Sequence, residues 1–480
     1  MNVETPLPER LFKAACLAVT AGLAAVALLY LVLFGKLMVA DMPTNKCSSD
    51  TCPRGMGRLL IFVPLLGIAA GLLWSRIRAD TATRRSWPAR LLAAVVALAA
   101  LWPGWSGYEW MRGPQMDVFG YQAPDRPSSV KPVGVWKPDG PSGMVVRART
   151  DMLVAFNGEG RTGWRLSAPD RAAVCALSRS TPSNVGIVAY EGDRPVCGSK
   201  IEAVDLAEGR KLWAKDLAPP SVSAAVGGTA VVAERGSLIG LDLREGVERW
   251  RVPVPGECRV MALDGAGDRA LYVEQCASAA RITAVDTRTG ARSWQTPLPT
   301  ASPLREAQVL SAGPVAVRVA ETAARGTDAV LLFDDTGRAR GSVPSSGPEE
   351  DLRSQPAPVV SGELLITPVK NGKAGGVSAY SLTDGHRVWH AGFGKESVNG
   401  LAAGPAGEVG VVTSYRWWKY LTRLDVDSGE REQESAVLRD APLGTRFAFY
   451  PSSPGYCVFV NLDQSGTLPP IFDMNPVMGW

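Results

Sequence analysis

A short motif recurs through the C-terminal two-thirds of this chain. An apolar run ends at a polar residue, a Gly follows in the turn, and a Trp comes four residues after the Gly. In the clearest copies, Ala203–Trp213, Gly240–Trp250 and Ala284–Trp294, Asp, Gly and Trp stay in step. A motif repeated at this period is the signature of an array of similar supersecondary units. The motif therefore constrains the architecture more than any other feature of the chain.

Seven copies can be counted when the polar residue is taken as the marker, and they lie 37 to 48 residues apart. The markers are Asn157, Asp205, Asp242, Asp286, Asp334, Ser381 and Asp425. Alternating or β-branched runs such as Ile282–Val285 and Val226–Ala233 precede the markers, as expected of half-buried strands. Each interval has room for four short strands with turns. The repeat thus predicts four-stranded antiparallel blades and an all-β propeller.

The number of blades is less tightly set than the fold. Seven markers favour seven blades, with a C-terminal strand at Tyr456–Leu462 returning to complete the first blade. Eight blades are the alternative, because Asn461–Gly466 resembles a worn eighth marker and Arg446–Tyr450 supplies another strand.

The recurring Trp is interpreted as a packing residue that fills the space between neighbouring blades. The residues assigned to this role are Trp164, Trp213, Trp250, Trp294 and Trp389. The fifth repeat has Gly341 at this position and the seventh has Gln433.

The N-terminal part is of another kind. Residues 14–35 carry no charge, which is enough to span a bilayer as a helix, and shorter apolar runs follow at 59–75 and 91–108. Trp102, Trp105, Tyr108 and Trp110 end the third run and suit a membrane interface. Three transmembrane α-helices are therefore expected before the propeller.

Loop charges predict the orientation. The loop between the second and third spans holds five Arg residues, so the positive-inside bias places it in the cytoplasm. The expected layout is a cytoplasmic tail at 1–13, a membrane anchor at 14–110, a Pro-rich extracytoplasmic linker at 111–141 and an extracellular propeller at 142–480. The predicted protein is a multi-pass protein of the cell membrane.

The cysteines agree with an oxidising location for the propeller. Cys258 and Cys276 flank an apparent hairpin and are expected to form a disulfide, as are Cys47 and Cys52 in the first loop. Cys175 and Cys197 form a third candidate pair, although they are not in simple register. Cys16 and Cys457 are expected to be buried thiols.

The sequence contains few residues whose type and spacing suggest catalysis or metal binding. The two histidines, His386 and His390, are four residues apart on one predicted strand, roughly 13 Å, which is too far to share a metal ion. No phosphate loop, zinc spacing or nucleophile elbow occurs. The net charge of +4 comes largely from the Arg-rich loop and does not suggest nucleic acid as a partner.

One aromatic and cationic cluster stands out in the seventh repeat, at a presumed turn between two strands. It consists of Tyr415, Arg416, Trp417, Trp418, Lys419 and Tyr420. Exposed, this cluster would suit a glycan, a partner protein or a membrane surface. Alternatively, Trp417 and Trp418 fold inward and replace the packing Trp that the repeat lacks.

The Asp, Gly and Trp pattern resembles the pyrroloquinoline-quinone-like propeller repeat, over roughly Asn157–Gly429. That family includes quinoprotein alcohol dehydrogenases and the propeller lipoprotein of the outer-membrane assembly machine. Quinone-dependent members resemble one another in a pair of adjacent cysteines and in acidic and amide calcium ligands. This chain has no Cys-Cys and no matching acidic cluster, so neither the quinone nor calcium is expected. The richness in Ala, Gly, Arg and Val resembles that of proteins from high-GC bacteria, in which membrane-anchored propellers of this kind are similar in layout.

Two hypotheses for the function follow. The preferred one is a non-enzymatic, membrane-anchored scaffold or sensor that binds an extracytoplasmic protein or envelope ligand. The alternative is a cell-surface oxidoreductase or hydrolase with its site in the propeller channel. Neither the ligand, the oligomeric state nor a catalytic residue can be read from the sequence.

Overall fold

The chain is described by a computed structural model. The described residues are 7–40, 56–78, 86–126, 128–137, 144–157, 160–169, 172–192, 196–277, 279–345, 356–371, 374–404, 407–416, 418–432, 435–453, 456–464 and 466–477. They form two compact units, one comprising residues 1–115 with 476–480 and the other residues 116–475.

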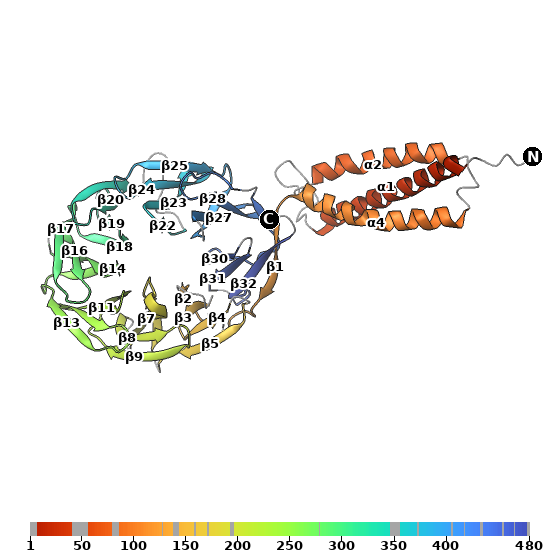
Figure 1. Ribbon diagram of the computed structural model, residues 1–480. Helices are drawn as coiled ribbons and strands as arrows, with labels where there is room; N and C mark the ends of the chain where they lie inside the picture. The colour runs from red at the N-terminus through yellow and green to blue at the C-terminus, as the bar shows by residue number, and fades with distance from the viewer. Residues whose placement is uncertain are drawn as a thin grey trace, which may run out of the picture. The chain divides into compact units, whose positions relative to one another are not determined.

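Three helices make up the N-terminal unit: α1 (Leu7–Ala40), α2 (Met56–Ile77) and α4 (Trp87–Arg112) (Figure 1). They are long and apolar enough to cross a membrane over Leu11–Met38, Met56–Arg76 and Trp87–Arg112. Their shared core includes Tyr30, Leu37, Leu59 and Tyr108, whereas many other leucines point outward. An apolar outer face of this kind is expected of helices surrounded by lipid. The three predicted spans lie inside these helices, and α1 already begins within the predicted tail.

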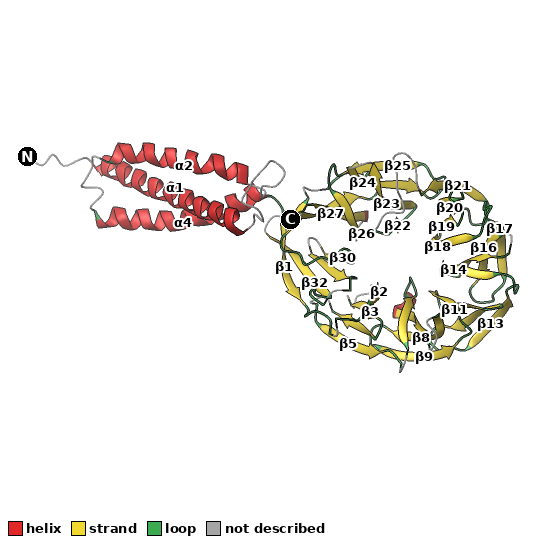
Figure 2. Cartoon of the chain, turned by 180° about the vertical axis from the view of Figure 1, so that it is seen from behind, coloured by secondary structure: helices red, strands yellow, loops and turns green. Residues whose placement is uncertain are grey.

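The second unit is a ring of antiparallel sheets (Figure 2). Six of its sheets have four strands in sequence order. The first three are β2 (Pro132–Trp136), β3 (Val145–Arg149), β4 (Met152–Phe156) and β5 (Thr162–Ser167); β6 (Ala173–Leu177), β7 (Val185–Glu191), β8 (Cys197–Asp205) and β9 (Arg210–Asp216); and β10 (Val222–Val226), β11 (Thr229–Glu234), β12 (Ser237–Asp242) and β13 (Glu248–Pro253).

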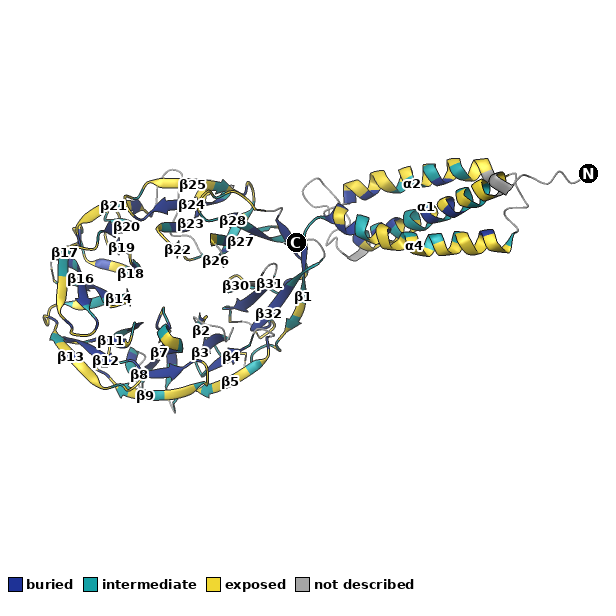
Figure 3. Cartoon of the chain, in the orientation of Figure 1, coloured by how far each residue is buried: buried dark blue, intermediate teal, exposed yellow. Residues whose placement is uncertain are grey.

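The next three follow the same order. They are β14 (Arg259–Ala266), β15 (Arg269–Gln275), β16 (Ala280–Asp286) and β17 (Arg292–Pro297); β18 (Leu304–Ala312), β19 (Val315–Glu321), β20 (Asp328–Phe333) and β21 (Ala339–Pro344); and β22 (Val359–Ser361), β23 (Leu364–Asn371), β24 (Ala374–Ser381) and β25 (Arg387–Gly392). The middle strands are mostly buried and the outermost strands mostly exposed (Figure 3).

The remaining strands form one eight-stranded sheet with the order β26-β27-β28-β29-β1-β32-β31-β30. These strands are β1 (Gln115–Tyr121), β26 (Ser397–Ala403), β27 (Glu408–Tyr415), β28 (Trp418–Asp425), β29 (Ala436–Leu438), β30 (Phe447–Ser453), β31 (Tyr456–Asn461) and β32 (Ile471–Val477). The sheet consists of two blades joined edge to edge, since Arg439 next to β29 donates its N–H to the carbonyl of Met116 in β1 (2.9 Å). Together with the six regular sheets, this gives eight units of four strands.

The strand order therefore agrees with the alternative of eight blades and differs from the favoured count of seven. β31 at Tyr456–Asn461 does not complete the first blade. It belongs to an eighth blade, whose outermost strand is β1 from the opposite end of the propeller sequence. The worn marker at 461–466 follows β31, which is the second strand of this blade, whereas the other markers follow the third strand of their blades.

The interpretation of residues 111–141 as an extended linker is also wrong. β1 and β2 both lie within this range, so the propeller begins at Met116 and not at residue 142. Among the described prolines, Pro114 precedes β1, Pro124 lies between the two strands and Pro132 is the first residue of β2. Pro residues outside a strand or at its first position are tolerated in sheets, so a high Pro content is compatible with a folded segment.

Each repeating Trp has a small residue opposite it in its own sheet. Trp250 pairs with Gly240, whereas Trp164, Trp213, Trp294 and Trp389 pair with alanines, and a register shift follows every pair. A Cβ on Gly240 would lie 2.1 Å from the Trp250 ring. The small partner lets the large ring lie flat on the sheet.

Each indole also reaches the next blade, where it lies against the Gly of the marker turn. The contacts are Trp164 on Gly209, Trp213 on Gly246, Trp250 on Gly290, Trp294 on Gly337 and Trp389 on Gly429. Four of the indoles donate their N–H to the carbonyl that follows the marker, at 2.7–3.0 Å from Leu206, Leu243, Thr287 or Val426. These contacts hold neighbouring blades together. The buried Trp294 N–H has no acceptor among the described residues. Its partner turn is one residue shorter than the other four, since Gly337 comes three residues after Asp334 and not four.

The boundary between the fifth and sixth blades is closed without a Trp. A Cβ on Gly341 would lie 2.3 Å from the carbonyl oxygen of Asp384, so the turn of the sixth blade occupies the space itself. Backbone atoms of the sixth blade therefore fill the space that the missing Trp side chain leaves at Gly341.

Two of the three expected disulfides are confirmed. Cys258 and Cys276 bridge the ends of the β14–β15 hairpin. Cys175, at the bulge of β6, bonds to Cys197 at the start of β8, where the register also shifts. Cys47 and Cys52 lie outside the described residues. Of the free thiols, Cys457 is buried and Cys16 is half-buried.

Candidate functional site

The aromatic cluster of the seventh repeat lies at a tight hairpin between β27 and β28, where Tyr415 pairs with Trp418. Arg416 is exposed in the turn with φ 55° and lies over the Tyr415 ring, 5.5 Å from its centre. Lys419, by contrast, points inward and donates to the carbonyls of Ala441 and Leu443 at 3.0 and 3.1 Å. Burial lowers the pKa of Lys419.

The six residues of this cluster therefore do not act as one surface. Arg416 and Tyr415 form the tip, Trp418 is half-buried, and Lys419 caps a loop of the same blade. Trp417 and Gln433 lie outside the described residues. Both interpretations of the two tryptophans stay predictions.

The two histidines serve separate local contacts. The Nδ1 of His390 lies 3.0 Å from the Ser378 hydroxyl, and the Nδ1 of His386 lies 2.5 Å from the Asp384 carboxylate. Cys258, Glu274 and Cys276 bring three side chains of metal-ligand types together. The two sulfurs are joined in a disulfide, and thiolates rather than disulfides bind metals.

A half-buried acid, Asp264, lies beside the central channel. Asp264 lies on β14 in a cavity of about 300 Å³ lined by the innermost strands β6, β10, β14 and β18. Burial raises the pKa of Asp264, while the N–H of Gly265 and the charge of Arg179 oppose this rise. A second channel cavity, of about 450 Å³, lies at the other side and is lined largely by apolar side chains of β26 and β30.

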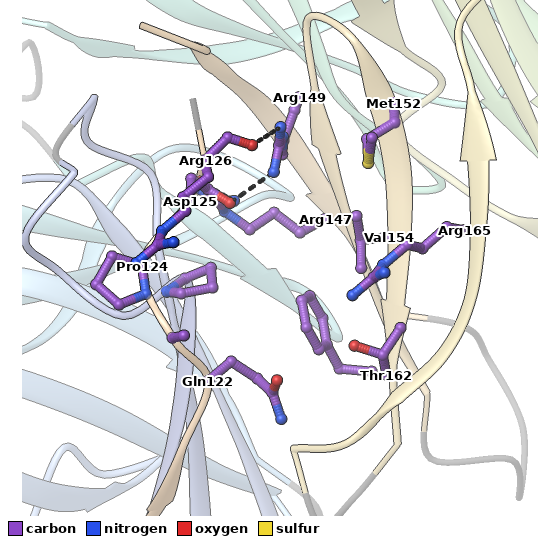
Figure 4. Close-up of a pocket in the computed structure, with 13 residues that line it drawn as sticks. Gln122, Pro124, Asp125, Arg126, Arg147, Arg149, Met152, Val154, Thr162 and Arg165 are labelled. Carbon is purple, nitrogen blue, oxygen red and sulfur yellow. Dashed lines mark hydrogen bonds and ion pairs between the residues drawn. The ribbon is translucent and has the colours of Figure 1, made fainter. Parts of the chain in front are cut away.

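A larger cavity, of about 580 Å³, lies between the first and the last blade (Figure 4). It is called the arginine pocket because four of its side chains are arginines. The lining residues are Gln122, Ala123, Pro124, Asp125, Arg126, Arg147, Arg149, Met152, Val154, Phe156, Thr162, Arg165 and Pro470.

Strand alternation explains why the arginines of the first blade meet here. Val146, Ala148 and Leu153 face the second blade, so Arg147, Arg149 and Val154 face the last blade. Residues 122–126 follow β1 and close the other side. The pocket is thus assembled from the segment that follows β1 and from the first blade, with Pro470 of the last blade as the one lining residue from the far end of the chain.

Two of the arginines are buried and paired. Arg147 and Arg149 bind the two oxygens of Asp125 at 2.7 and 2.8 Å, and Arg149 also binds Asp151 at 2.7 Å. The Nε of Arg147 donates to the carbonyl of Asn461 in β31 (2.9 Å), which joins the first blade to the last. Burial lowers the pKa of Arg147, although the Asp125 carboxylate opposes this effect. Asp125 is saturated by the two guanidinium groups.

The other two arginines are exposed. Among the described ion pairs, neither Arg126 nor Arg165 has a carboxylate partner. Figure 4 shows Arg165 reaching from the outermost strand toward the middle of the pocket, above apolar side chains that include Val154. The pocket therefore offers two uncompensated cations over an apolar floor, an arrangement suited to an anion with an apolar body.

This pocket could not be predicted from the sequence. One signal was present: the run Val145–Arg149 places two arginines in alternation in an otherwise apolar strand. Its partner Asp125 lay in the segment interpreted as a linker, and the two could not be connected without the ring closure.

Residues 197–435 match the family of PQQ-like repeats described as outer membrane protein assembly factor BamB. A comparison with curated proteins finds no significant match. Among solved structures, BamB from Moraxella catarrhalis is similar at 15% identity, covering 72% of this chain and 99% of that chain with a TM-score of 0.44. The C-terminal WD40 domain of Sif2 is similar at 10% identity, covering 76% and 99%, with a TM-score of 0.49.

Quinohemoprotein alcohol dehydrogenase ADHIIG from Pseudomonas putida HK5 is similar at 10% identity, covering 74% of this chain and 75% of that chain, with a TM-score of 0.42. The repeat match covers the Asp, Gly and Trp copies of the second to the seventh blade, which agrees with the resemblance drawn from those residues. The repeats at residues 197–435 of the propeller are thus PQQ-like repeats.

Proposed function

We propose that this chain is a membrane-anchored, extracytoplasmic binding protein whose propeller holds a protein partner or envelope ligand without catalysing a reaction. The observation that carries the proposal is the arginine pocket. Its base is preorganised by Asp125, whereas Arg126 and Arg165 at its mouth are free of ion pairs among the described residues. Fixed charges on a rigid ring suit recognition, because little side-chain entropy is lost at the base on binding.

The proposed location places the N-terminus and the Arg-rich loop in the cytoplasm and the propeller outside. Three apolar helices and two disulfides in the propeller support this layout. Thiol labelling of spheroplasts with a membrane-impermeant maleimide tests it. Asp335→Cys, whose parent side chain is 79% exposed, should react in intact spheroplasts. Arg78→Cys, at the end of α2, should react only after permeabilisation, and the reverse pattern would contradict the proposed orientation.

Partner binding is tested by crosslinking in intact membranes. Photo-crosslinking residues placed at 165 and at 416 compare the arginine pocket with the hairpin tip. A partner recovered reproducibly from position 165, but not from position 338 on the fifth blade, would support the pocket as the binding site. Replacing Trp417 and Trp418 by Ala tests the hairpin: unchanged recovery by a folded variant would exclude these two residues.

A second candidate is an enzyme acting in the channel, and Asp264 is the observation that favours it. A half-buried carboxyl beside a cavity, with its pKa raised by burial, is typical of a general acid. The preferred proposal includes no quinone and no calcium. Incubating the purified protein with both, and with a redox dye, separates the candidates, since quinone-dependent dye reduction would refute a purely binding role.

A further inference from the structure

The arginine pocket lies at a blade boundary without a tryptophan, near the turn that corresponds to the Trp-covered turns of other blades. At five boundaries an indole of one blade lies on the marker Gly of the next. The last blade presents β1 to the first blade, and β1 contains no Trp. The corresponding marker Gly of the first blade is Gly160. Its Cβ position has no described atom within 4 Å, although its φ of 71° matches that of the covered glycines.

The aromatic residues of β1 do not fill this space. Phe119 and Tyr121 are 78% and 69% exposed. Phe156 and Thr162, which pair across the Gly160 turn, line the pocket instead. The opening therefore follows from the closure of the ring by a strand that lacks the repeat's indole.

The chemistry of the opening adds a second requirement. An apolar floor of Met152, Val154 and Phe156 suits a flat apolar group, as at the other boundaries. The exposed Arg126 and Arg165 at the mouth require anions beside that group. Asp125 does not repel an anion, because both of its oxygens are bound by arginines.

We propose that the arginine pocket receives an aromatic side chain of a partner protein, flanked by carboxylates, in a space like the one that a tryptophan fills at five other blade boundaries. The proposal rests on the binding function proposed above and names the chemistry of the partner segment. The aromatic ring lies on the floor beside Gly160, and the flanking carboxylates pair with Arg126 and Arg165.

Three end-capped pentapeptides test the proposal by titration calorimetry against the detergent-solubilised full chain. Asp-Glu-Trp-Asp-Glu carries both features, Asn-Gln-Trp-Asn-Gln lacks the charges, and Asp-Glu-Ala-Asp-Glu lacks the ring. We expect the first to bind at least about tenfold more tightly than either control, since a buried aromatic anchor and two charge pairs are each worth that much. Equal affinities, or no saturable binding up to about 1 mM, would overturn the proposal.

Two variants locate the binding. Arg126→Ala with Arg165→Ala should weaken binding of the acidic Trp peptide about tenfold, and the effect should fall at high salt. Its matched control removes two exposed arginines elsewhere, Arg305→Ala with Arg338→Ala, and should leave the affinity unchanged.

Thr162→Trp fills the cavity while keeping all four arginines. It should abolish binding without lowering the free energy of unfolding, whereas unimpaired binding by this variant would place the peptide elsewhere and refute the proposal. A partner crosslinked in membranes whose recovery is insensitive to both variants would leave the binding function standing and exclude this pocket as its site.

Discussion

The contact between an indole and the marker Gly of the next blade can be tested by a pair of matched glycine substitutions. Gly290 and Gly160 have nearly the same backbone conformation, with φ 72° and 71°. A Cβ on Gly290 would lie 2.6 Å from Cε3 of Trp250, whereas one on Gly160 would meet no described atom within 4 Å. The two sites differ in the neighbouring indole and share the backbone strain.

The expected losses of stability follow from the backbone strain at each glycine and from the contact of the new Cβ with the indole. An L-residue in the left-handed region costs roughly 1–2 kcal/mol, partly offset by the lower entropy of the unfolded chain, so Gly160→Ala should cost about 1 kcal/mol. Trp250 is buried and cannot swing away, so Gly290→Ala should cost about 1–3 kcal/mol more through overpacking. The expected total at Gly290 is about 2–4 kcal/mol.

Urea unfolding of the solubilised full chain, followed by near-ultraviolet circular dichroism, measures both losses. The Trp250→Ala background completes a double-mutant cycle, in which Gly290→Ala should cost no more than Gly160→Ala because the indole is gone. Equal losses at the two glycines in the wild-type background would refute the view that the indole locks the boundary.

Three further outcomes are expected. In the same urea assay, Trp250→Phe should lower the free energy of unfolding by about 1 kcal/mol more than Trp294→Phe. The reason is that the Trp250 N–H donates to the carbonyl of Thr287, whereas the buried Trp294 N–H has no described acceptor. Equal losses would contradict this reasoning. Burial raises the pKa of Glu321, but hydrogen bonds from Thr327 and Ser302 outweigh it and lower that pKa from 4.5 to about 2. The ionised Glu321 therefore stabilises the fold fully above about pH 4.5, and this stabilisation is lost as the pH falls toward 2. Between pH 5 and 2, the free energy of unfolding of Glu321→Gln should fall less than that of wild type. Parallel pH profiles of the two proteins would refute the assignment. Replacing Cys258 and Cys276 by Ser should lower the free energy of unfolding by about 3 kcal/mol, as expected for the 18-residue separation, and a reducing agent should then affect the variant less than wild type.

The blade architecture could be predicted because its signals are local. Asp242 accepts the backbone N–H groups of Arg244 and Glu245, and Gly246 takes the positive φ that ends the turn. Such turn chemistry, together with strand alternation, is readable within a dozen residues. The same holds for the apolar spans and for the Cys258–Cys276 hairpin.

The ring closure and the site could not be predicted in this way. β1 has no marker of its own, and its place is set by hydrogen bonds to β29 and β32, more than 300 residues away. Lys419 likewise looked like a surface cation until the fold placed the carbonyls of Ala441 and Leu443 around it.

The sequence by itself determined the repeating unit, the apolar helices and two disulfides, since each depends on neighbours along the chain. Only the tertiary structure decided the eighth blade and the arginine pocket. A closed ring must join its two ends, and the strand that joins them here brings no tryptophan, so the boundary it forms is left open and lined by charge. The physical reason is long-range: whether a side chain such as Arg165 faces a neighbour or a cavity depends on which blade arrives beside it.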